Sequence, residues 1–518
     1  MSMDERIAIG QHLFTGFPGP RLTPEFALRM RESKIGNIIL FAHNIGTPEQ
    51  LKDLCADIQA LVMEATGYPA FIAIDQEGGA VSRLGKDCTV VPGAMAVAAT
   101  GNPDNAYTAG LITGRELRAM GVNFNLAPVV DVNSNPENPV IGVRSYGEDP
   151  QEVIRYSLQM ARGLTDAGVL CCAKHFPGHG DTAVDSHIGL PQVNKTLDEL
   201  SACELLPFQA AADAGIPAVM STHILFPRVE QKKVPATMSR RIMTDLLKKQ
   251  MGFKGLVLSD CMMMGAIADH YGTVDGMVAA VMAGVDLVFA SHSVELAAQA
   301  ADKLLEELRG GRINAEELAL STALILQFKS RLQTADRPAL ETVGSQAHRQ
   351  QAQALYEQSL TLVRLPLGRL PPLGERPLFV GCLPYTATQA TSPGTAGISF
   401  ADTLRERFGG SAARMSENPD REEIGRIAAL VPEHSSIVIG TYNGHLRTGQ
   451  LDMVRALSGS DAPVVCIALR NPYDLAGLPA NVSAVAAYAY NDDVLRAVTR
   501  MLSGDIDTPG VLPVTLKR

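Results

Sequence analysis

Eight short apolar runs alternate with amphipathic stretches over about the first 330 residues, and this alternation limits the possible folds more than any other feature. The runs are 10–16, 35–42, 70–76, 122–132, 169–175, 218–224, 255–260 and 285–290. Helical patterns occupy 48–66, 102–120, 149–166, 196–214, 239–250, 272–283, 293–309 and 314–333. Strands buried on both faces read as continuous apolar runs, so the pattern predicts an α/β protein with a TIM-like (β/α)8 barrel. An open doubly wound sheet is the main alternative, but the G-x-G-x-x-G signature that it often carries is absent after the early strands.

A second α/β region follows a polar, proline-containing stretch around 333–345. A helical pattern at 346–363 precedes a loop with three prolines, and the later strand candidates are 376–383, 435–441, 463–469 and 484–490. Helical patterns at 400–408, 419–430, 447–458 and 492–503 separate them. Four or five strands predict a smaller three-layer α/β sandwich. We expect a barrel over 1–335, a helix and linker over 336–372, and the sandwich domain over 373–518.

Charge and cysteine content narrow the partners and the compartment. The 518 residues include 45 basic and 55 acidic ones, a net charge of −10, without a basic cluster. This balance argues against nucleic acid or an anionic membrane as the main partner. No run of 18 apolar residues occurs, and the N-terminal segment MSMDERIAIGQHLF is acidic where a signal peptide is basic. Eight irregularly spaced cysteines, with no C-x-x-C pair, suit a reducing compartment, so we expect a cytoplasmic protein.

Polar residues follow five of the predicted barrel strands. In a barrel of this kind the loops after the strands build the active site. The five places are Asp75 in IDQEGG, Arg144 in VRSYGEDP, the segment AKHFPGHGDTAVDSH at 173–187, His223 in STHI and Asp260 in VLSDCMMMG. These positions are the candidate functional residues.

The segment at 173–187 carries the densest chemistry. Proline and glycine at positions 177, 178 and 180 predict an irregular loop, in which Asp185 and His187 are close enough to hydrogen-bond. A carboxylate beside an imidazole favours the imidazolium form and fixes its tautomer. Such a pair can protonate a leaving group and then act as a base.

A metal site is an alternative reading of the same loop. His175 and His179 are four residues apart, and Asp181 and Asp185 add further ligand types. However, His175 ends a strand while His179 lies beyond a proline and a glycine, so these two side chains do not share a helical face. We therefore expect no metal or other cofactor. A solvated loop without chemistry is the remaining alternative.

Asp260 is the second candidate centre of chemistry. An aspartate directly after an apolar strand projects into the barrel mouth, where it must be hydrogen-bonded or used. Taken alone it could equally cap the following helix. Together with Asp185 and His187 it supplies a nucleophile facing an acid/base, the arrangement that retaining glycosidases need.

Four of these motifs resemble those of bacterial β-N-acetylglucosaminidases of glycoside hydrolase family 3. They are KHFPGHGDTAVDSH, IDQEGGAVSRL, VRSYGEDP and VLSDCMMMGAI, and the resemblance covers essentially the whole barrel. The region 346–518 resembles the sandwich domain of two-domain members, with weaker motifs. The resemblance implies a retaining mechanism in which Asp260 is the nucleophile and His187, held by Asp185, is the acid/base. It also implies that the N-acetylglucosamine ring is gripped by Asp75, Arg83, Arg144, Lys174 and His175, with His223 as a weaker member.

One departure and several alternatives accompany this resemblance. Ala80 stands where the family often has arginine, so a positive charge beside the sugar site is missing. The chain has no tryptophan, so a sugar must be held by hydrogen bonds and smaller rings. We expect an exo-acting enzyme on muropeptide or chitin fragments, with small N-acetylglucosaminides as its partners. A phosphorylase, a metal-dependent hydrolase and a non-catalytic sugar-binding protein are the alternatives. In the second domain, Tyr442, Asn443 and His445 fit loop structure as well as substrate contacts.

Overall fold

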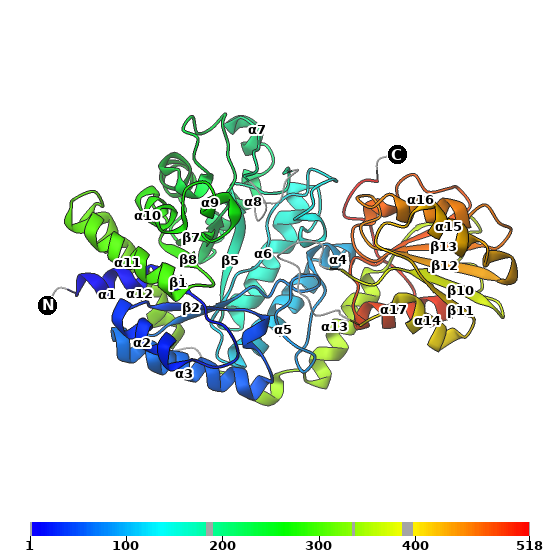
Figure 1. Cartoon of the computed structure of the whole chain (residues 1–518), viewed down its shortest axis with the longest axis horizontal. Coiled ribbons are helices and arrows are strands. Elements are labelled where there is room, and N and C mark those ends of the chain that lie inside the picture. Colours follow the sequence, from blue (N-terminus) through cyan, green and yellow to red (C-terminus); the bar gives the residue numbers. More distant parts are fainter. Residues whose placement is uncertain (1–2, 183–189, 334–336, 386–396, 517–518) are drawn as a thin grey trace.

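The computed structural model describes residues 3–182, 190–333, 337–385 and 397–516. Eight parallel strands close into a barrel in chain order, and six further strands form a second sheet (Figure 1). This architecture confirms the predicted fold class. The barrel strands are β1 (Leu13–Thr15), β2 (Asn37–Leu40), β3 (Phe71–Ile74), β4 (Phe124–Asn125), β5 (Leu170–Phe176), β6 (Ala218–Ser221), β7 (Leu256–Cys261) and β8 (Leu287–Ala290).

Helices surround the barrel, and several begin at a threonine or aspartate followed by proline. Thr47 caps α3 by accepting a hydrogen bond from the Gln50 amide, and Asp149 caps α6 in the same way through Gln151. The helices are α1 (Glu5–Gln11), α2 (Pro24–Ser33), α3 (Pro48–Thr66), α4 (Ala94–Ala99), α5 (Asp104–Ala119), α6 (Pro150–Asp166), α7 (Leu197–Ser201), α8 (Leu205–Asp213), a π-helix at Arg241–Gln250, α9 (Gly265–Ala268), α10 (Thr273–Ala283), α11 (Val294–Arg309) and α12 (Ala315–Gln333).

The amino-terminal end of the barrel is filled by side chains. Phe14 and Phe289 stack inside it with ring centroids 4.2 Å apart. Ile325 of α12 packs into the same buried cluster. The Lys329 ammonium, also on α12, donates to Gln11 Oε1 at 2.6 Å and to the Gly36 carbonyl at 3.0 Å. Because this end is packed, a substrate site has to lie at the carboxyl ends of the strands.

Two predicted barrel strands differ from the observed ones. The first was expected at 10–16, but residues up to Gln11 belong to α1 and the strand starts at Leu13. The fourth was expected at 122–132, but regular pairing is limited to Phe124–Asn125, with an isolated bridge between Val129 and Lys174. Pro128 falls between them and has no amide hydrogen to donate to a ladder.

The second sheet has the order β11-β10-β12-β13-β14-β9, with β9 antiparallel to β14. Helices α15 and α16 lie on one face and α14 and α17 on the other (Figure 1). The elements are α13 (Gln346–Ser359), β9 (Thr361–Arg364), β10 (Pro377–Gly381), α14 (Phe400–Phe408), β11 (Ser411–Arg414), α15 (Arg421–Ala428), β12 (Ser436–Thr441), α16 (Gly449–Leu457), β13 (Val464–Ala468), β14 (Val482–Ala486) and α17 (Asp492–Ser503).

This domain corrects two predictions. The helix expected over 346–363 ends at Ser359, and the next residues form the edge strand β9. The β-branched Thr361 and Val363 favour a strand there, and the partner β14 is more than a hundred residues away in the sequence. The four or five strands expected become six in the described residues, because the short strands β9 and β11 were not predicted.

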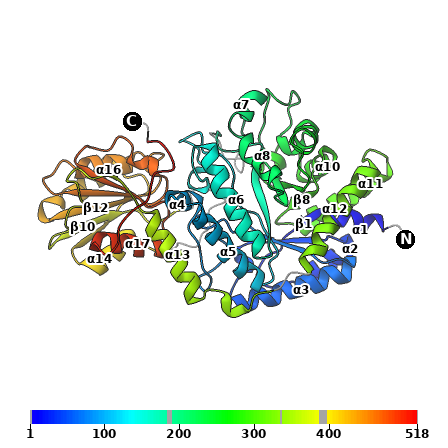
Figure 2. The ribbon, with the colours of Figure 1, turned by 180° about the vertical axis from the view of Figure 1, so that it is seen from behind.

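The two domains share a buried interface beside α4 and α13 (Figure 2). Met95 and Ala96 of α4 and Val143 belong to the same apolar cluster as the second sheet. Asn471, just after β13, accepts a hydrogen bond from the Val143 amide at 3.0 Å. Gly142 has a φ of 45°, and an added Cβ would stand 2.5 Å from the Asn471 side chain. Glycine is therefore required for this contact.

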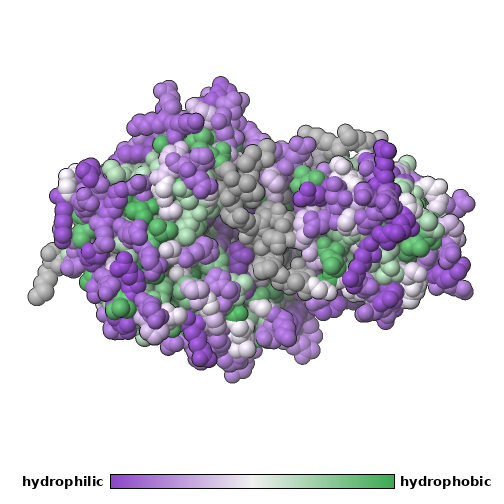
Figure 3. All heavy atoms as spheres, viewed as in Figure 1, coloured by the Kyte–Doolittle hydropathy of each residue, from purple (hydrophilic) through white to green (hydrophobic). Residues whose placement is uncertain are grey.

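Hydrophilic residues cover most of the face seen in Figure 3, on both domains. Among the helices of the described ranges, none has the length and apolar character needed to cross a membrane.

Candidate active site

A small cavity of about 200 Å³ opens at the carboxyl ends of the barrel strands. Six of the predicted site residues line it together, namely Asp75, Arg83, Arg144, Lys174, His175 and Asp260. They lie at the carboxyl ends of β5 and β7 or in the segments that follow β3 and β4, so the closure of the barrel brings together residues up to 185 positions apart in the sequence. Aromatic and thioether groups complete the wall, including Phe41, His292, Met263 and Met264.

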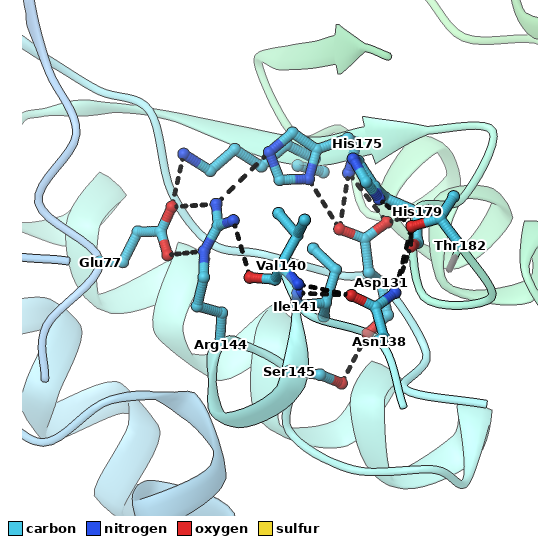
Figure 4. A network of polar contacts seen from close by, with 12 residues as sticks. Glu77, Asp131, Asn138, Val140, Ile141, Arg144, Ser145, His175, His179 and Thr182 are labelled. Carbon is cyan, nitrogen blue, oxygen red and sulfur yellow. Dashed lines mark hydrogen bonds and ion pairs between the residues drawn. The ribbon is translucent and has the colours of Figure 1, made fainter. Parts of the chain in front are cut away.

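A buried ion-pair network forms one side of the cavity (Figure 4). Glu77 receives two hydrogen bonds from the Arg144 guanidinium, at 2.8 and 2.9 Å. The Lys174 ammonium lies 2.7 Å from both Glu77 and Asp75. The side chains of Glu77, Arg144 and Lys174 are 7%, 6% and 2% exposed, whereas that of Asp75 is 20% exposed. Asp75 is thus the member of the network that reaches toward solvent.

The charges in this network stabilise one another. Burial by itself raises the pKa of Glu77, but the positive charges of Arg144 and Lys174 outweigh it and hold that pKa well below its usual range. Burial likewise lowers the pKa of Lys174, but the carboxylates of Asp75 and Glu77 reverse the shift and raise it. Glu77 and Lys174 therefore stay ionised near neutral pH.

Asp131 fixes two histidines, His175 near the end of β5 and His179 in the loop that follows. Its Oδ2 lies 2.7 Å from His175 Nδ1, and its Oδ1 accepts the His179 amide at 2.7 Å. A carboxylate can only accept, so Nδ1 of His175 carries the proton and Nε2 points to Arg144 Nη2 at 3.5 Å. Burial raises the pKa of Asp131, but His175 and then His179 outweigh it and hold the pKa below its usual range.

His179 is buried in its neutral form. Burial, followed by the neighbouring charge of His175, lowers its pKa to about 4. Its Nδ1 lies 2.8 Å from Thr182 Oγ1. Asn138 donates to the His179 carbonyl at 2.9 Å and reaches Thr182 Oγ1 at 3.3 Å (Figure 4). These contacts fix the loop as far as Thr182, the last described residue before position 183.

We predict that His179 makes folding pH-dependent. The unfolded histidine takes up a proton below pH about 6.5, whereas the folded one does so only below about 4. The free energy of unfolding should therefore fall as pH drops, by about 1.4 kcal/mol per pH unit between these values. Denaturant unfolding at a series of pH values gives the free energy of unfolding as a function of pH. Between about pH 4 and 6.5 this free energy should fall less steeply in His179→Gln than in the wild type, and above pH 7 the two proteins should have the same slope. An unaltered slope below pH 6.5 would contradict the assignment.

Asp260 and His223 meet at the end of β7. Asp260 lines the cavity, and its Oδ1 accepts the Cys261 amide at 2.6 Å. His223 Nε2 donates to the Cys261 carbonyl at 3.0 Å, and Nδ1 lies 2.9 Å from Thr237 Oγ1. His223 thus supports the backbone that carries Asp260. Asp185 and His187, the expected acid/base pair, lie outside the described residues.

In the part of the chain that the structure describes, no three His, Cys, Asp or Glu side chains are arranged to hold a metal ion. The rings of His175 and His179 meet edge to face with centroids 5.6 Å apart. Asp181, a further candidate ligand, instead pairs with Lys195 at 3.0 Å.

Sequence reasoning missed Glu77 and Asp131 as site residues. Glu77 lies two positions after Asp75, so the alternation of strand side chains extended past the end of β3 could have drawn attention to it. Asp131 lies in an apolar run, and a buried aspartate needs a partner. That signal was available, but it did not identify the partner.

Comparison with known proteins agrees with this geometry. The sequence profile described as the glycosyl hydrolase family 3 N terminal domain matches residues 10–327. The chain belongs to glycoside hydrolase family 3. The matched segment spans all eight barrel strands, so the family 3 signature coincides with the part of the chain that builds the cavity.

Two relatives resemble this family 3 chain over nearly its whole length, and a third resembles it over about two thirds. Beta-hexosaminidase A of Pseudoalteromonas piscicida is 32% identical over 96% of this chain and 91% of that protein. The structure of a family 3 β-N-acetylglucosaminidase from Paenibacillus sp. str. FPU-7 superposes with a TM-score of 0.91 at 35% identity, covering 99% of each chain. NagZ from Neisseria gonorrhoeae, solved with N-trifluoroacetyl-D-glucosamine, is 30% identical, with a TM-score of 0.55, and covers 67% of this chain and 97% of that one. These matches confirm the prediction of a glycoside hydrolase of the β-N-acetylhexosaminidase class.

Proposed function

We propose that this protein is a retaining exo-β-N-acetylglucosaminidase that releases terminal N-acetylglucosamine from muropeptide or chitin fragments. The observation that carries the proposal is the small charged cavity with Asp260 at its edge. At about 200 Å³ it is below the usual range for drug-sized ligands, which favours a single sugar ring over a longer chain. The relatives named for β-hexosaminidase and β-N-acetylglucosaminidase activity support the same choice of sugar.

In this proposal the reaction has two displacements. An Asp260 oxygen attacks the anomeric carbon, the bond to the leaving oxygen breaks, and His187 gives its proton to that oxygen. The product of this step is a glycosyl ester on Asp260. His187, now neutral, then takes a proton from water, whose oxygen attacks the same carbon and releases Asp260. Asp185 orients the His187 ring and favours its charged form.

The buried network would hold the sugar during both steps. Asp75 is the acceptor that reaches toward solvent, and Lys174 and Arg144 present fixed donors beside it. Carboxylates and cations at such spacing suit the hydroxyl groups of a sugar ring, each of which donates and accepts. We assign Arg83 and His175 to the same binding of the sugar ring. We assign His223 the role of positioning the end of β7, which carries Asp260.

A reducing, cytoplasmic setting is part of the proposal. All eight cysteines lie in described ranges and are free thiols. Burial raises the pKa of Cys171 to about 12, which keeps that thiol protonated and unreactive. A thiol-rich interior of this kind suits a compartment in which disulfides do not form.

The direct test is incubation with 4-nitrophenyl N-acetyl-β-glucosaminide, with and without inorganic phosphate, followed by identification of the sugar product. Free N-acetylglucosamine of β configuration in the first moments supports a retaining hydrolase. The sugar 1-phosphate would instead identify a phosphorylase, and release of the α anomer would exclude retention.

We predict that chelation leaves the rate unchanged. The proposed steps use carboxylate and imidazole groups and route no charge through a metal. Prolonged EDTA treatment followed by desalting should retain at least about nine-tenths of the activity on the aryl glycoside. Activity that is lost on chelation and returns with zinc would favour the alternative of a metal-dependent hydrolase built on His175 and His179.

A further inference from the structure

A cleft of about 1060 Å³ lies between the barrel and the second domain. Its barrel side includes Gly79, Ala80 and Ser82, which belong to the same loop as Glu77 and Arg83 of the small cavity at the carboxyl ends of the barrel strands, which we call the sugar cavity. On the other side, Asn471 binds the Val143 amide, one residue before Arg144. The cleft and the sugar cavity are therefore lined by residues of the same loop, 77–84.

The second domain presents the carboxyl edge of its parallel strands to this cleft. Tyr442 follows β12, Arg470 follows β13, and Tyr488 follows β14. In the sheet, β10 has β11 on one side and β12 on the other. After β11 the chain crosses back over β10 to form β12, so the strand order reverses between β10 and β12. Open α/β sheets bind ligands at the carboxyl ends of strands beside such a reversal.

Arg470 is the unusual residue of this edge. It is 3% exposed, yet it lines the cleft. Its Nη1 donates to the Tyr442 hydroxyl at 3.0 Å, and its guanidinium lies 5.6 Å from the centre of the Tyr442 ring. Within the described ranges no carboxylate lies at ion-pair distance from it. A buried cation costs free energy unless an anion accompanies it, and four of its five N–H donors are not used by Tyr442.

Two other arginines of the cleft are already paired with carboxylates, and its further cations, Lys86 and Arg349, are exposed to solvent. Arg496 binds Asp493, and Arg500 lies 2.6 Å from Glu357. The acidic side chains of these pairs are thus neutralised by their own partners. Arg470 differs from these cations because it is buried and held in one orientation by Tyr442, which suits it to receive an external anion.

We propose that this cleft binds the part of the substrate beyond the cleaved bond, and that Arg470 recognises an anionic group on it, a carboxylate in the first instance. The inference rests on the proposed function, because it takes the sugar cavity as the neighbouring subsite. Ala80, which lies between Glu77 and Arg83 in the sequence, lines the barrel side of the cleft with only a methyl side chain. The second domain thereby selects which fragment the barrel cleaves.

The test compares two substrates that differ only in charge. One is N-acetylglucosaminyl-β-1,4-N-acetylmuramic acid, and the other is the methyl ester of its lactyl carboxyl group. The wild-type kcat/KM should favour the free acid by about tenfold or more, mostly through KM. Arg470→Gln should bring this ratio close to one. Arg496→Gln is the matched control, because it removes an arginine that lines the same cleft but is paired, and it should keep the wild-type ratio.

Further arms keep each outcome decisive. Thermal unfolding checks that Arg470→Gln is folded. If that variant is unfolded, Tyr442→Phe replaces it in the test, because it removes only the hydroxyl that orients Arg470. We expect Tyr442→Phe to lower the free-acid to methyl-ester ratio of kcat/KM severalfold. A ratio unchanged in both variants would overturn the proposal. A phosphate-dependent rate that is lost in Arg470→Gln, with the ratio intact, would show that the anion is free phosphate and overturn it as well. If the wild type cleaves neither disaccharide nor the aryl glycoside, the proposed function itself fails.

Discussion

Asp260→Ala is expected to reduce turnover of every N-acetylglucosaminide by about four orders of magnitude or more. Without the carboxylate no glycosyl ester can form, and nothing else in the proposal attacks the anomeric carbon. The side chain is partly exposed at the end of β7, where its Oδ1 accepts the neighbouring Cys261 amide, so the barrel should survive the change. Steady-state kinetics on the aryl glycoside measures the loss, and thermal unfolding monitors the fold.

Azide sharpens this result. A small anion can enter the space vacated by the carboxylate and attack from the same face, which yields the glycosyl azide of α configuration. Asp269→Ala is the control, because it removes an exposed aspartate on the segment that follows α9 and should keep wild-type rates. Residual activity of the Asp260 variant above about a tenth of wild type would remove Asp260 from the role of nucleophile.

His187→Ala is expected to separate substrates by their leaving groups. A nitrophenolate departs with little proton assistance, whereas the oxygen of a natural disaccharide needs a proton as its bond breaks. The variant should therefore keep appreciable first-step reactivity on nitrophenyl glycosides and lose a factor of about 10² to 10⁴ on the disaccharide. Pre-steady-state release of nitrophenol, compared with disaccharide turnover, measures the difference.

Two companion measurements test the same role. Azide should partly restore the second step of His187→Ala, since it needs no base, and give the β-glycosyl azide. Asp185→Ala should show the same leaving-group pattern more mildly, because the imidazole remains without its partner. Equal losses on good and poor leaving groups would assign His187 to binding or folding instead.

The barrel was predictable because its strands are buried on both faces and therefore appear as apolar runs. The errors came from the same rule. The run at 122–132 is mostly apolar, but Pro128 interrupts its pairing, and Thr361–Arg364 looked like the end of a helix because its partner strand is distant in the sequence. Local patterns indicate burial, whereas pairing depends on contacts that only the folded chain makes.

The candidate site divides along a similar line. Asp75, Arg144, Lys174, His175 and Asp260 could be selected because they stand where apolar runs end. Glu77 and Asp131 were missed, because they act by neutralising and orienting those residues from inside the protein. Such partners are defined by distances of about 2.7 Å across different loops, which no spacing in the sequence records.

The hydrogen bond from the Val143 amide to Asn471 makes the two domains poor candidates for separation. This bond anchors the turn Gly142–Arg144, and the Arg144 side chain donates to Glu77 at the wall of the sugar cavity. If the chain is truncated to its barrel, the turn that carries Arg144 loses its anchor on Asn471, and the wall of the cavity is disturbed. A barrel without this sheet therefore needs another hydrogen-bond acceptor for the Val143 amide. We expect that acceptor to lie opposite Gly142, where Asn471 lies in this chain.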